Sequence, residues 1–433
     1  MDAETPHQLI LFGPPGTSKS HTAQHVKAKS LDAKLVPIAF HPEFSYGEFV
    51  ARLLPMSEGG KIHYSVYAGP FLRALALAYA DAQRNVVLLI DEINRGNCAE
   101  IFGDTFQLLD REDDGSSCYE IVASELTIKA LHQELDELKH LEDQWSASLK
   151  RVMETRLLKL PSNLYLIGTM NTSDESIYFM DSAFKRRWNF EFMSPGFDGV
   201  PAEQRDAALF APHSKYSLKQ FVDALNKFVI DNCSAPKLDD KLIGPWFIKA
   251  KKDVPLDVSA DLAHLKALAP QVAVYNSGAD NSRKFEQALL ALASKMGGSM
   301  QQEIHTLAGY QPTNGPSVLK NIAADPDSYY YKSEKHFAAE AGGPLLIEAF
   351  VKALESHIAQ QRPTVRYVAK SDVVGKLFLY LWDNVFDRDK TPICKLLGLE
   401  RSAMRTFGQF VDHADDFVAL LCNPQAAATA AKI

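Results

Sequence analysis

The sequence contains few cysteines and no long apolar run. Its five cysteines are spread over 433 residues and form neither a C-x-x-C pair nor the Cys/His spacing of a metal site. We therefore expect reduced, structural thiols rather than disulfides or metal ligands. No apolar stretch approaches the roughly 18 residues that cross a bilayer. The first residues lack the basic and apolar regions of a secretion signal. These absences predict a cytoplasmic protein without a membrane partner.

An excess of positive charge is missing as well. The chain has 46 Lys and Arg against 54 Asp and Glu, which gives a formal net charge of −8. Proteins built mainly to coat nucleic acid are usually basic, so this balance argues against that class but leaves room for a local basic patch. With 433 residues, 46% of them hydrophobic, the chain can hold two or three domains with sizeable cores.

Apolar strands alternate with helical stretches over the first 190 or so residues. This alternation predicts an α/β fold, in which helices cover a mostly parallel sheet. The expected strands are Gln8–Phe12, Leu35–Phe40, Val86–Ile90 and Leu164–Thr169. The expected helices between them are Phe71–Gln83 and Cys98–Asp110.

A further helical stretch, Glu125–Leu158, has apolar residues at spacings of three and four. Two interpretations stay open from the sequence. The stretch is either an amphipathic helix or helical hairpin packed on the core, or an arm that protrudes to contact a partner.

Strand signals fade after Met193, and helices dominate the rest of the chain. The expected helical segments are Tyr216–Asn232, Ser282–Met296, Pro344–Gln360 and Val373–Phe386, with a polar stretch at Tyr310–Asp327. We expect a large domain over residues 1–195, with a helical insertion at about 122–158. A mostly helical second domain over 196–433 would carry an inserted block at about 251–370.

A near-match to a phosphate-binding loop follows the first expected strand. Its residues are Gly13, Pro14, Pro15, Gly16, Thr17, Ser18, Lys19 and Ser20. In the pattern G-x-x-x-x-G-K-[ST], backbone N–H groups and a helix N-terminus hold phosphate oxygens. Lys19 would add positive charge, and the Ser20 hydroxyl would bind Mg²⁺. Ser18 stands where the pattern has glycine, which tolerates backbone angles that other residues avoid.

Two carboxylates, Asp91 and Glu92, end the apolar strand Val86–Ile90. In enzymes with such a loop, the first would hold Mg²⁺ and the second would polarise the attacking water. A third signal, Asn171, follows the strand Leu164–Thr169. Because ligands of open α/β sheets bind at the carboxyl ends of the strands, these side chains should meet in one crevice.

Arg186 and Arg187 follow in the segment Asp181–Trp188. A paired arginine at a helix end is either a solvated or carboxylate-paired feature, or one that reaches a neighbouring subunit and neutralises charge there. The segment alone favours the first interpretation.

Together, these motifs resemble the McrB-type branch of the AAA+ proteins. The resemblance rests on the loop and on the segments Asp91–Asn97, Gly168–Asp174, Phe40–Val50 and Ile243–Phe247. It covers about residues 7–250 and returns near Leu377–Phe386. The resemblance implies an AAA+ sheet domain with helices on both faces, followed by a helical lid. It also implies a ring, commonly a hexamer, that hydrolyses a nucleotide at its subunit interfaces.

The resemblance assigns roles residue by residue. Phosphate and Mg²⁺ binding fall to Lys19, Ser20 and Asp91, activation of water to Glu92, and the sensor role to Asn171. Arg186 and Arg187 would be fingers that act on the neighbouring subunit, and Asn94 and Arg95 would line the interface. The cofactors would be Mg²⁺ with ATP or GTP.

The chain departs from the family at Ser18, normally glycine, and at Glu175, normally arginine. It also leaves no room for an N-terminal target-recognition domain, so DNA specificity would come from the inserted block or a separate subunit. We expect a motor subunit that works with an effector such as an McrC-like nuclease. The alternatives are a nucleotide-gated assembly module with weak hydrolysis, or a MoxR-like chaperone that acts on protein.

Overall fold

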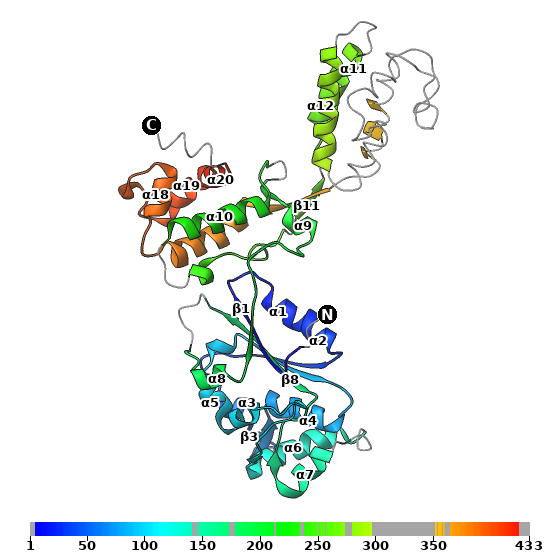
Figure 1. Cartoon of the computed structure of the whole chain (residues 1–433), viewed down its shortest axis with the longest axis vertical. Coiled ribbons are helices and arrows are strands. Elements are labelled where there is room, and N and C mark those ends of the chain that lie inside the picture. The colour runs from blue at the N-terminus through cyan, green and yellow to red at the C-terminus, as the bar shows by residue number, and fades with distance from the viewer. Residues whose placement is uncertain are drawn as a thin grey trace. The chain divides into compact units, whose positions relative to one another are not determined.

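The computed structural model describes residues 5–140, 145, 147–172, 178–211, 214–233, 238–250, 252–255, 257–272, 279–296, 351–352, 354–356, 358–359 and 364–423. The chain divides into two compact units (Figure 1). Unit 1 comprises Met1–Val200, Lys219–Lys249 and Val374–Ile433, and unit 2 comprises Pro201–Leu218 and Ala250–Val373. The domain boundaries expected from the sequence stay a prediction. Glu175 and the stretch Tyr310–Asp327 lie outside the described residues.

A five-stranded parallel sheet forms the centre of unit 1. Its strand order is β2-β5-β8-β1-β9. The strands are β1 (Gln8–Gly13), β2 (Lys34–Ala39), β5 (Val86–Asp91), β8 (Leu164–Asn171) and β9 (Asn189–Phe192). The four expected strands and the α/β fold are therefore confirmed, and β9 adds an edge strand beside β1.

Each face of this sheet buries its own core because side chains alternate along a strand. On one face, Leu9, Val87 and Ile167 pack in a cluster with Ala23 and Ala28. These two alanines lie in the helical run formed by α1 (Lys19–Thr22), η1 (Ala23–Lys27) and α2 (Ala28–Ser30). On the other face, the alternate strand residues pack in a larger cluster with α4 (Pro70–Ala80), α5 (Cys98–Phe102) and the 3₁₀ segment η3 (Gly103–Leu109). Helices thus cover both faces of the sheet (Figure 1).

The expected helical stretch from Glu125 is a pair of helices packed on this larger core. They are α6 (Glu125–Glu137) and α7 (Ala147–Thr155), followed by the short strand β7 (Leu157–Leu158), which pairs with β6 (Ile121–Val122). Leu131, Leu135, Leu149 and Val152 are each at most 2% exposed. Burial of these four side chains confirms the packed interpretation of the stretch rather than the protruding arm.

An antiparallel hairpin between α3 (Tyr46–Phe49) and α4 has no clear signal in the sequence. Its strands are β3 (Ala51–Glu58) and β4 (Lys61–Ala68), joined at Gly59 and Gly60. Both glycines have positive φ, the conformation that a two-residue hairpin turn requires. Ile62 and Tyr64 are 73% and 66% exposed. Because apolar residues lie on exposed positions of the hairpin, it lacks the in–out alternation that marks a half-buried strand.

The later segments of unit 1 are helical and share an aromatic core. The helices are α10 (Leu218–Asn232), η5 (Leu238–Lys241), η6 (Val373–Phe378), η7 (Leu381–Val385), α18 (Thr391–Leu397), η8 (Arg401–Ala403), α19 (Phe407–Asp412) and α20 (Ala414–Cys422). Phe410 contacts Phe378 and Phe417, and Phe228 contacts Phe386 and Phe417. Among the described helices, none combines the length and apolar character needed to span a bilayer.

Unit 2 contains three short strands, in the part of the chain where strand signals fade and helices dominate. Its sheet has the order β10-β12-β11, with β10 (Ala208–Phe210), β11 (Lys252–Pro255) and β12 (Thr364–Ala369). Strands β10 and β11 have only three and four residues, too few for a periodic signal, and β12 carries Arg366 in place of a continuous apolar run. The described helices of unit 2 include α9 (Ala202–Arg205), α11 (Ser259–Val272), α12 (Ala279–Met296) and α17 (Lys370–Asp372), and Leu265, Phe285 and Leu292 lie in its core.

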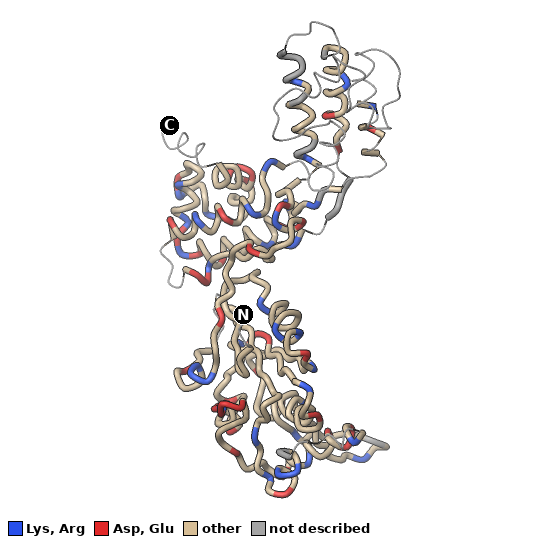
Figure 2. The backbone as a smooth tube through the Cα atoms, turned by 45° about the vertical axis from the view of Figure 1, so that its right-hand side comes forward, with Lys and Arg blue, Asp and Glu red and all other residues tan. Residues whose placement is uncertain are grey.

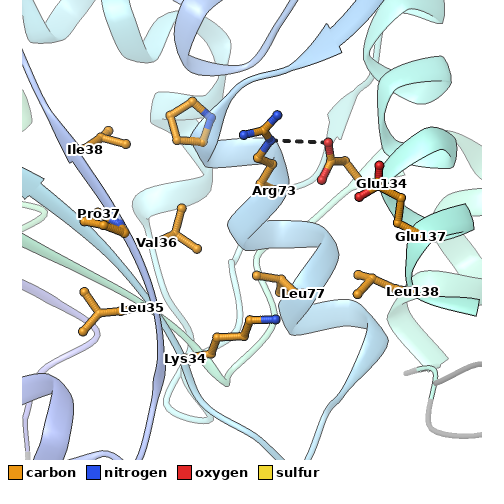
Figure 3. Close-up of a pocket in the computed structure, with 11 residues that line it drawn as sticks. Lys34, Leu35, Val36, Pro37, Ile38, Arg73, Leu77, Glu134, Glu137 and Leu138 are labelled. Carbon is orange, nitrogen blue, oxygen red and sulfur yellow. Dashed lines mark hydrogen bonds and ion pairs between the residues drawn. The ribbon is translucent and has the colours of Figure 1, made fainter. Parts of the chain in front are cut away.

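Strand β2 forms one edge of the main sheet and carries Pro37. The N–H groups of Lys34 and Phe40 bond to Asn85 and Asp91 beside β5, so residues 35, 37 and 39 face the open edge. A pocket of about 550 Å³ lies beside this edge, lined by β2, α4 and α6 (Figure 3). Arg73 and Glu134 form an ion pair at its rim, with 3.4 Å between Nε and Oε1.

Candidate active site

The loop between β1 and α1 has two glycines for which no side chain has room. Gly13 and Gly16 have φ angles of +146° and +81°. A Cβ on Gly13 would lie 2.6 Å from the carbonyl oxygen of Met193, and one on Gly16 would lie 2.4 Å from the backbone nitrogen of Phe247. Both the angles and the close backbone contacts therefore require glycine at these positions.

Ser18 occupies the left-handed conformation that glycine adopts most easily. Its φ and ψ are 65° and 24°, and it directly precedes α1. For a residue with a Cβ, this conformation costs roughly 1–2 kcal/mol. The Ser18 side chain makes no capping hydrogen bond to α1 that would offset the cost. The loop therefore keeps its expected shape despite the serine.

Lys19 lies under the loop with its side chain only 7% exposed. Its Nζ donates to the carbonyl oxygens of Gly13, at 3.0 Å, and Pro14, at 2.9 Å. The Thr17 hydroxyl also donates to Pro14, at 2.9 Å. A buried ammonium beside a glycine-rich turn and a helix N-terminus is a donor set that fits a phosphate chain.

Ser20 and Asp91 lie together at the end of the loop. The Ser20 hydroxyl donates to Oδ1 of Asp91 at 2.7 Å. The Thr169 hydroxyl donates to the same oxygen. A hydroxyl and a carboxylate are the hard oxygen ligands that Mg²⁺ prefers, so this pair fits the metal expected from the sequence. Thr169 was missed as a site residue because its strand position predicts only burial.

Glu92 and Asn171 meet at the carboxyl ends of β5 and β8. The Nδ2 atom of Asn171 donates to Oε1 of Glu92 at 2.6 Å. Arg95 donates through Nε to Oε2 of the same carboxylate at 3.3 Å. Glu92 itself has a left-handed backbone, with φ of 53°, which turns its side chain out of the strand direction. The structure thus brings together the two residues expected to handle water.

Comparison with known proteins is consistent with this geometry. Residues 8–188 match the family described as the AAA domain of the dynein-related subfamily. Residues 8–188 therefore form an AAA domain, and the chain is similar to McrB-related proteins.

Two curated relatives have names from restriction systems. Over 271 residues, the AAA+ chain is 29% identical to the Type II restriction enzyme BsuMI component YdiS of Bacillus subtilis (strain 168), covering 56% of this chain and 73% of YdiS. Over 195 residues, it is 28% identical to the Type IV methyl-directed restriction enzyme EcoKMcrB subunit of Escherichia coli (strain K12), covering 44% of this chain and 36% of that subunit. The chain therefore matches only about a third of the McrB subunit.

Asn94 of the AAA domain is buried, although the resemblance placed it at a subunit interface. It is 1% exposed, and its Nδ2 donates to the backbone carbonyl of Asn171 at 2.6 Å. Its backbone carbonyl accepts from the N–H of Tyr178 at 2.8 Å. Arg95, whose side chain is 43% exposed, is the neighbour that reaches the surface. Through its hydrogen bond to Asn171, the last residue of β8, Asn94 holds the carboxyl end of that strand in place.

The paired arginines of the AAA domain have different surroundings. Arg186 is exposed, whereas the side chain of Arg187 is only 9% exposed. Arg187 forms an ion pair with Asp110, with 2.7 Å between Nη2 and Oδ2. Its guanidinium lies 4.1 Å from the centre of the Phe106 ring. Only Arg186 is thus available at the surface of this subunit.

A segment from the later helical part of unit 1 contacts the phosphate loop directly. The N–H groups of Gly244 and Trp246 donate to the carbonyls of Pro15, at 2.9 Å, and Gly16, at 2.8 Å. A Cβ on Gly244 would lie 2.4 Å from the backbone of Gly16. Phe247 also contacts Tyr380, with 5.1 Å between ring centres. The segment Ile243–Phe247 was one of those that carry the AAA+ resemblance, but its contact with the phosphate loop could not be predicted from the sequence.

Proposed function

We propose that this protein is an oligomeric NTPase that couples hydrolysis to remodelling or translocation. It would be the cytoplasmic motor subunit of a restriction-like or anti-phage defence system. The observation that carries the proposal is the meeting of Glu92 with Asn171 beside the Ser20–Asp91 pair. A buried ammonium, two carboxylates and a sensor amide at one sheet edge form the constellation that phosphoryl transfer to water requires.

Each side chain has a distinct task in this proposal. The loop Gly13–Ser20 would hold the phosphates of ATP, with GTP as the alternative, and Ser20 and Asp91 would hold Mg²⁺. When bound, Mg²⁺ supplies positive charge that offsets the charge of the phosphate oxygens. Glu92 would accept a proton from the attacking water, and Asn171 would keep the Glu92 carboxylate oriented. Arg186 would act on the neighbouring subunit.

Phosphate release tests the enzymatic part. The wild type should hydrolyse ATP or GTP in the presence of Mg²⁺, whereas Lys19→Ala should bind the nucleotide poorly. Glu92→Gln should bind it but turn it over about 100-fold more slowly, because the amide cannot accept the proton. Glu100→Gln, on an exposed position of α5, is the matched control and should behave as wild type. Wild-type turnover no faster than that of Glu92→Gln would exclude hydrolysis as the function.

The proposed partners are inferred from the two curated relatives and from the distribution of charged residues on this chain. YdiS is a component of a restriction enzyme, and the McrB protein is a subunit of another. We propose by analogy a homo-oligomeric ring, with six subunits as the expected number, and a separate effector such as an McrC-like nuclease. Basic and acidic residues are interspersed along the described helices (Figure 2). This mixture favours DNA contact through the partner or the inserted block of about residues 251–370.

One observation favours a second candidate, a nucleotide-gated assembly module with weak hydrolysis. The carboxylate of Glu92, the proposed base, accepts hydrogen bonds from Asn171 and from the positively charged Arg95. A carboxylate that is paired with a cation is a weaker base. Tight binding of a fluorescent nucleotide, assembly on binding and no phosphate release would identify this module.

A further inference from the structure

We propose that Arg187 is a positioning residue that acts within its own subunit and fixes the turn that presents Arg186. Arg187 would then not be a second finger. The inference rests on the proposed role of Arg186 and assigns a different task to its neighbour. It is carried by the contacts that the Arg187 guanidinium makes with Asp110, Ala183 and Phe106.

Three groups hold this guanidinium. Its Nη2 pairs with Oδ2 of Asp110 at 2.7 Å, and its Nη1 donates to the carbonyl of Ala183 at 3.0 Å. Its central carbon lies over the Phe106 ring, 4.1 Å from the ring centre. Phe106 lies in η3 and Asp110 follows it, so the arginine joins η3 to the end of α8 (Ser182–Lys185).

Burial makes these contacts hard to leave. With the Arg187 side chain 9% exposed and that of Asp110 30% exposed, both charges are partly removed from water. Removal of one partner from such a pair leaves the other charge uncompensated, which is strongly unfavourable. A guanidinium that reached a neighbouring subunit would have to break the ion pair, the hydrogen bond and the ring contact together. Arg187 is therefore committed to its own subunit.

Arg186 has the opposite surroundings. It is exposed and caps the end of α8, where its N–H donates to the carbonyl of Ser182 at 3.1 Å. Among the described residues it has no ion-pair partner. Because neighbouring side chains point in different directions around a helix, an inward Arg187 requires that Arg186 point elsewhere. The ion pair with Asp110 thus sets the direction of the exposed arginine.

The Asp110→Asn variant separates the two roles, because it removes the ion pair of Arg187 while both arginines stay in the sequence. If Arg187 anchors the turn, loss of the ion pair misplaces Arg186, and kcat should fall about 10- to 100-fold with KM for the nucleotide nearly unchanged. Arg187→Met, which keeps an apolar contact with Phe106, should show the same loss. Arg186→Ala should lose about 1000-fold or more, and adding Asp110→Asn to it should change little.

A second finger predicts the opposite result. Asp110→Asn would then free Arg187 and leave kcat unchanged or raised, while Arg187→Met would be as inactive as Arg186→Ala. Either outcome would overturn the anchor. Glu134→Gln, which breaks the Arg73–Glu134 pair of the same unit, is the matched control and should leave kcat unchanged (Figure 3).

Subunit mixing distinguishes misplacement from misfolding. Lys19→Ala subunits keep an intact Arg186 but cannot bind nucleotide, so they should restore turnover when mixed with Asp110→Asn subunits. Failure of this rescue would overturn the anchor as the cause of the loss.

A readout without hydrolysis keeps this inference separate from the proposed function. If the wild type shows no turnover, or Arg186→Ala keeps wild-type turnover, the finger role fails. The anchor is then tested by thermal unfolding alone. Arg187→Met and Asp110→Asn should lower the midpoint by about 5 °C or more, and Arg186→Ala should leave it unchanged. Equal midpoints for all three would overturn the anchor.

Discussion

Ser18 shows how a departure from a sequence pattern can leave the backbone intact. The serine adopts the φ of 65° that glycine would adopt, so the loop shape is preserved at an energetic cost. We expect Ser18→Gly to raise the free energy of unfolding by about 1 kcal/mol or less, because relief of the strain is partly offset by the greater freedom of glycine in the unfolded chain.

The same variant should change kcat less than about 3-fold, since the loop already has the required conformation. Chemical denaturation and phosphate release measure the two quantities. Ser18→Ala is the control, because it keeps the strain and removes the hydroxyl, and it should gain no stability. A lower stability for Ser18→Gly would contradict the strain argument.

Asn94 determines the position of the proposed sensor from beneath the site. In the structure, Nδ2 of Asn94 lies 2.6 Å from the backbone carbonyl oxygen of Asn171. Asn94→Asp keeps the shape of the side chain but places a carboxylate oxygen opposite that carbonyl oxygen, so the hydrogen bond is lost. We expect a loss of about 2 kcal/mol in the free energy of unfolding and a fall in kcat of about 10-fold or more. Asn85→Asp is the matched control, because Asn85 makes the same amide-to-carbonyl bond to Leu31. It should lose stability but keep kcat.

Cys98 should be unreactive in the folded protein. Burial raises the pKa of its thiol to about 12, so at pH 8 the thiol is neutral and shielded. Iodoacetamide should label the exposed Cys118 first and Cys98 only after unfolding, as peptide mass spectrometry would show. The unfolded thiol loses its proton near pH 9, so the stabilising contribution of Cys98 is complete below pH 9 and declines up to pH 12. Rapid labelling of Cys98 in the native protein would contradict its burial.

The residues of the candidate site differ in how well the sequence predicts them. Five site residues come at or just after the carboxyl end of a recognisable strand: Lys19, Ser20, Asp91, Glu92 and Asn171. Because these strands are parallel, the sheet alone brings the five residues to the same end of the strands. The contact of Arg95 with Glu92 and the burial of Arg187 could not be predicted. They depend on side-chain directions and on pairing with residues distant in the chain, such as Asp110.

At the scale of elements, the segment Ile243–Phe247 joins the later helices of unit 1 to the phosphate loop. Gly244→Ala should weaken nucleotide binding about 10-fold or more, because the added Cβ would lie 2.4 Å from the Gly16 backbone, which has no room to move away. Titration of a fluorescent nucleotide measures the effect. Gly375→Ala is the matched control, since nothing lies within 4 Å of its added Cβ, and it should bind as wild type. Unchanged nucleotide binding by Gly244→Ala would contradict the prediction and show that the phosphate loop keeps its function when the segment Ile243–Phe247 shifts.

Elements with strong periodicity were predictable, and short or exposed ones were not. The buried strand β5 is a continuous apolar run, and the packed helix α6 has a clear apolar pattern over 13 residues. The hairpin of β3 and β4 and the strands of unit 2 lack such a pattern. Their pairing depends on contacts such as Ala208 with Tyr367, which lie far apart in the chain.

At the scale of the whole molecule, the proposed hydrolysis depends on contact between subunits. Arg186→Ala subunits lack the finger, and Lys19→Ala subunits lack nucleotide binding, so each alone should be inactive. A mixture should regain part of the wild-type turnover, because a Lys19→Ala subunit can supply Arg186 to a neighbour that binds nucleotide. Phosphate release measured over a range of mixing ratios checks this. No recovery at any ratio would argue against action between subunits.

Pro37 has a consequence for contacts between separate molecules of this protein. The β2 edge exposes backbone groups that could pair with a strand of another molecule, and proline removes the central N–H donor from that edge. The proline thus hinders two molecules from joining their sheets through this edge.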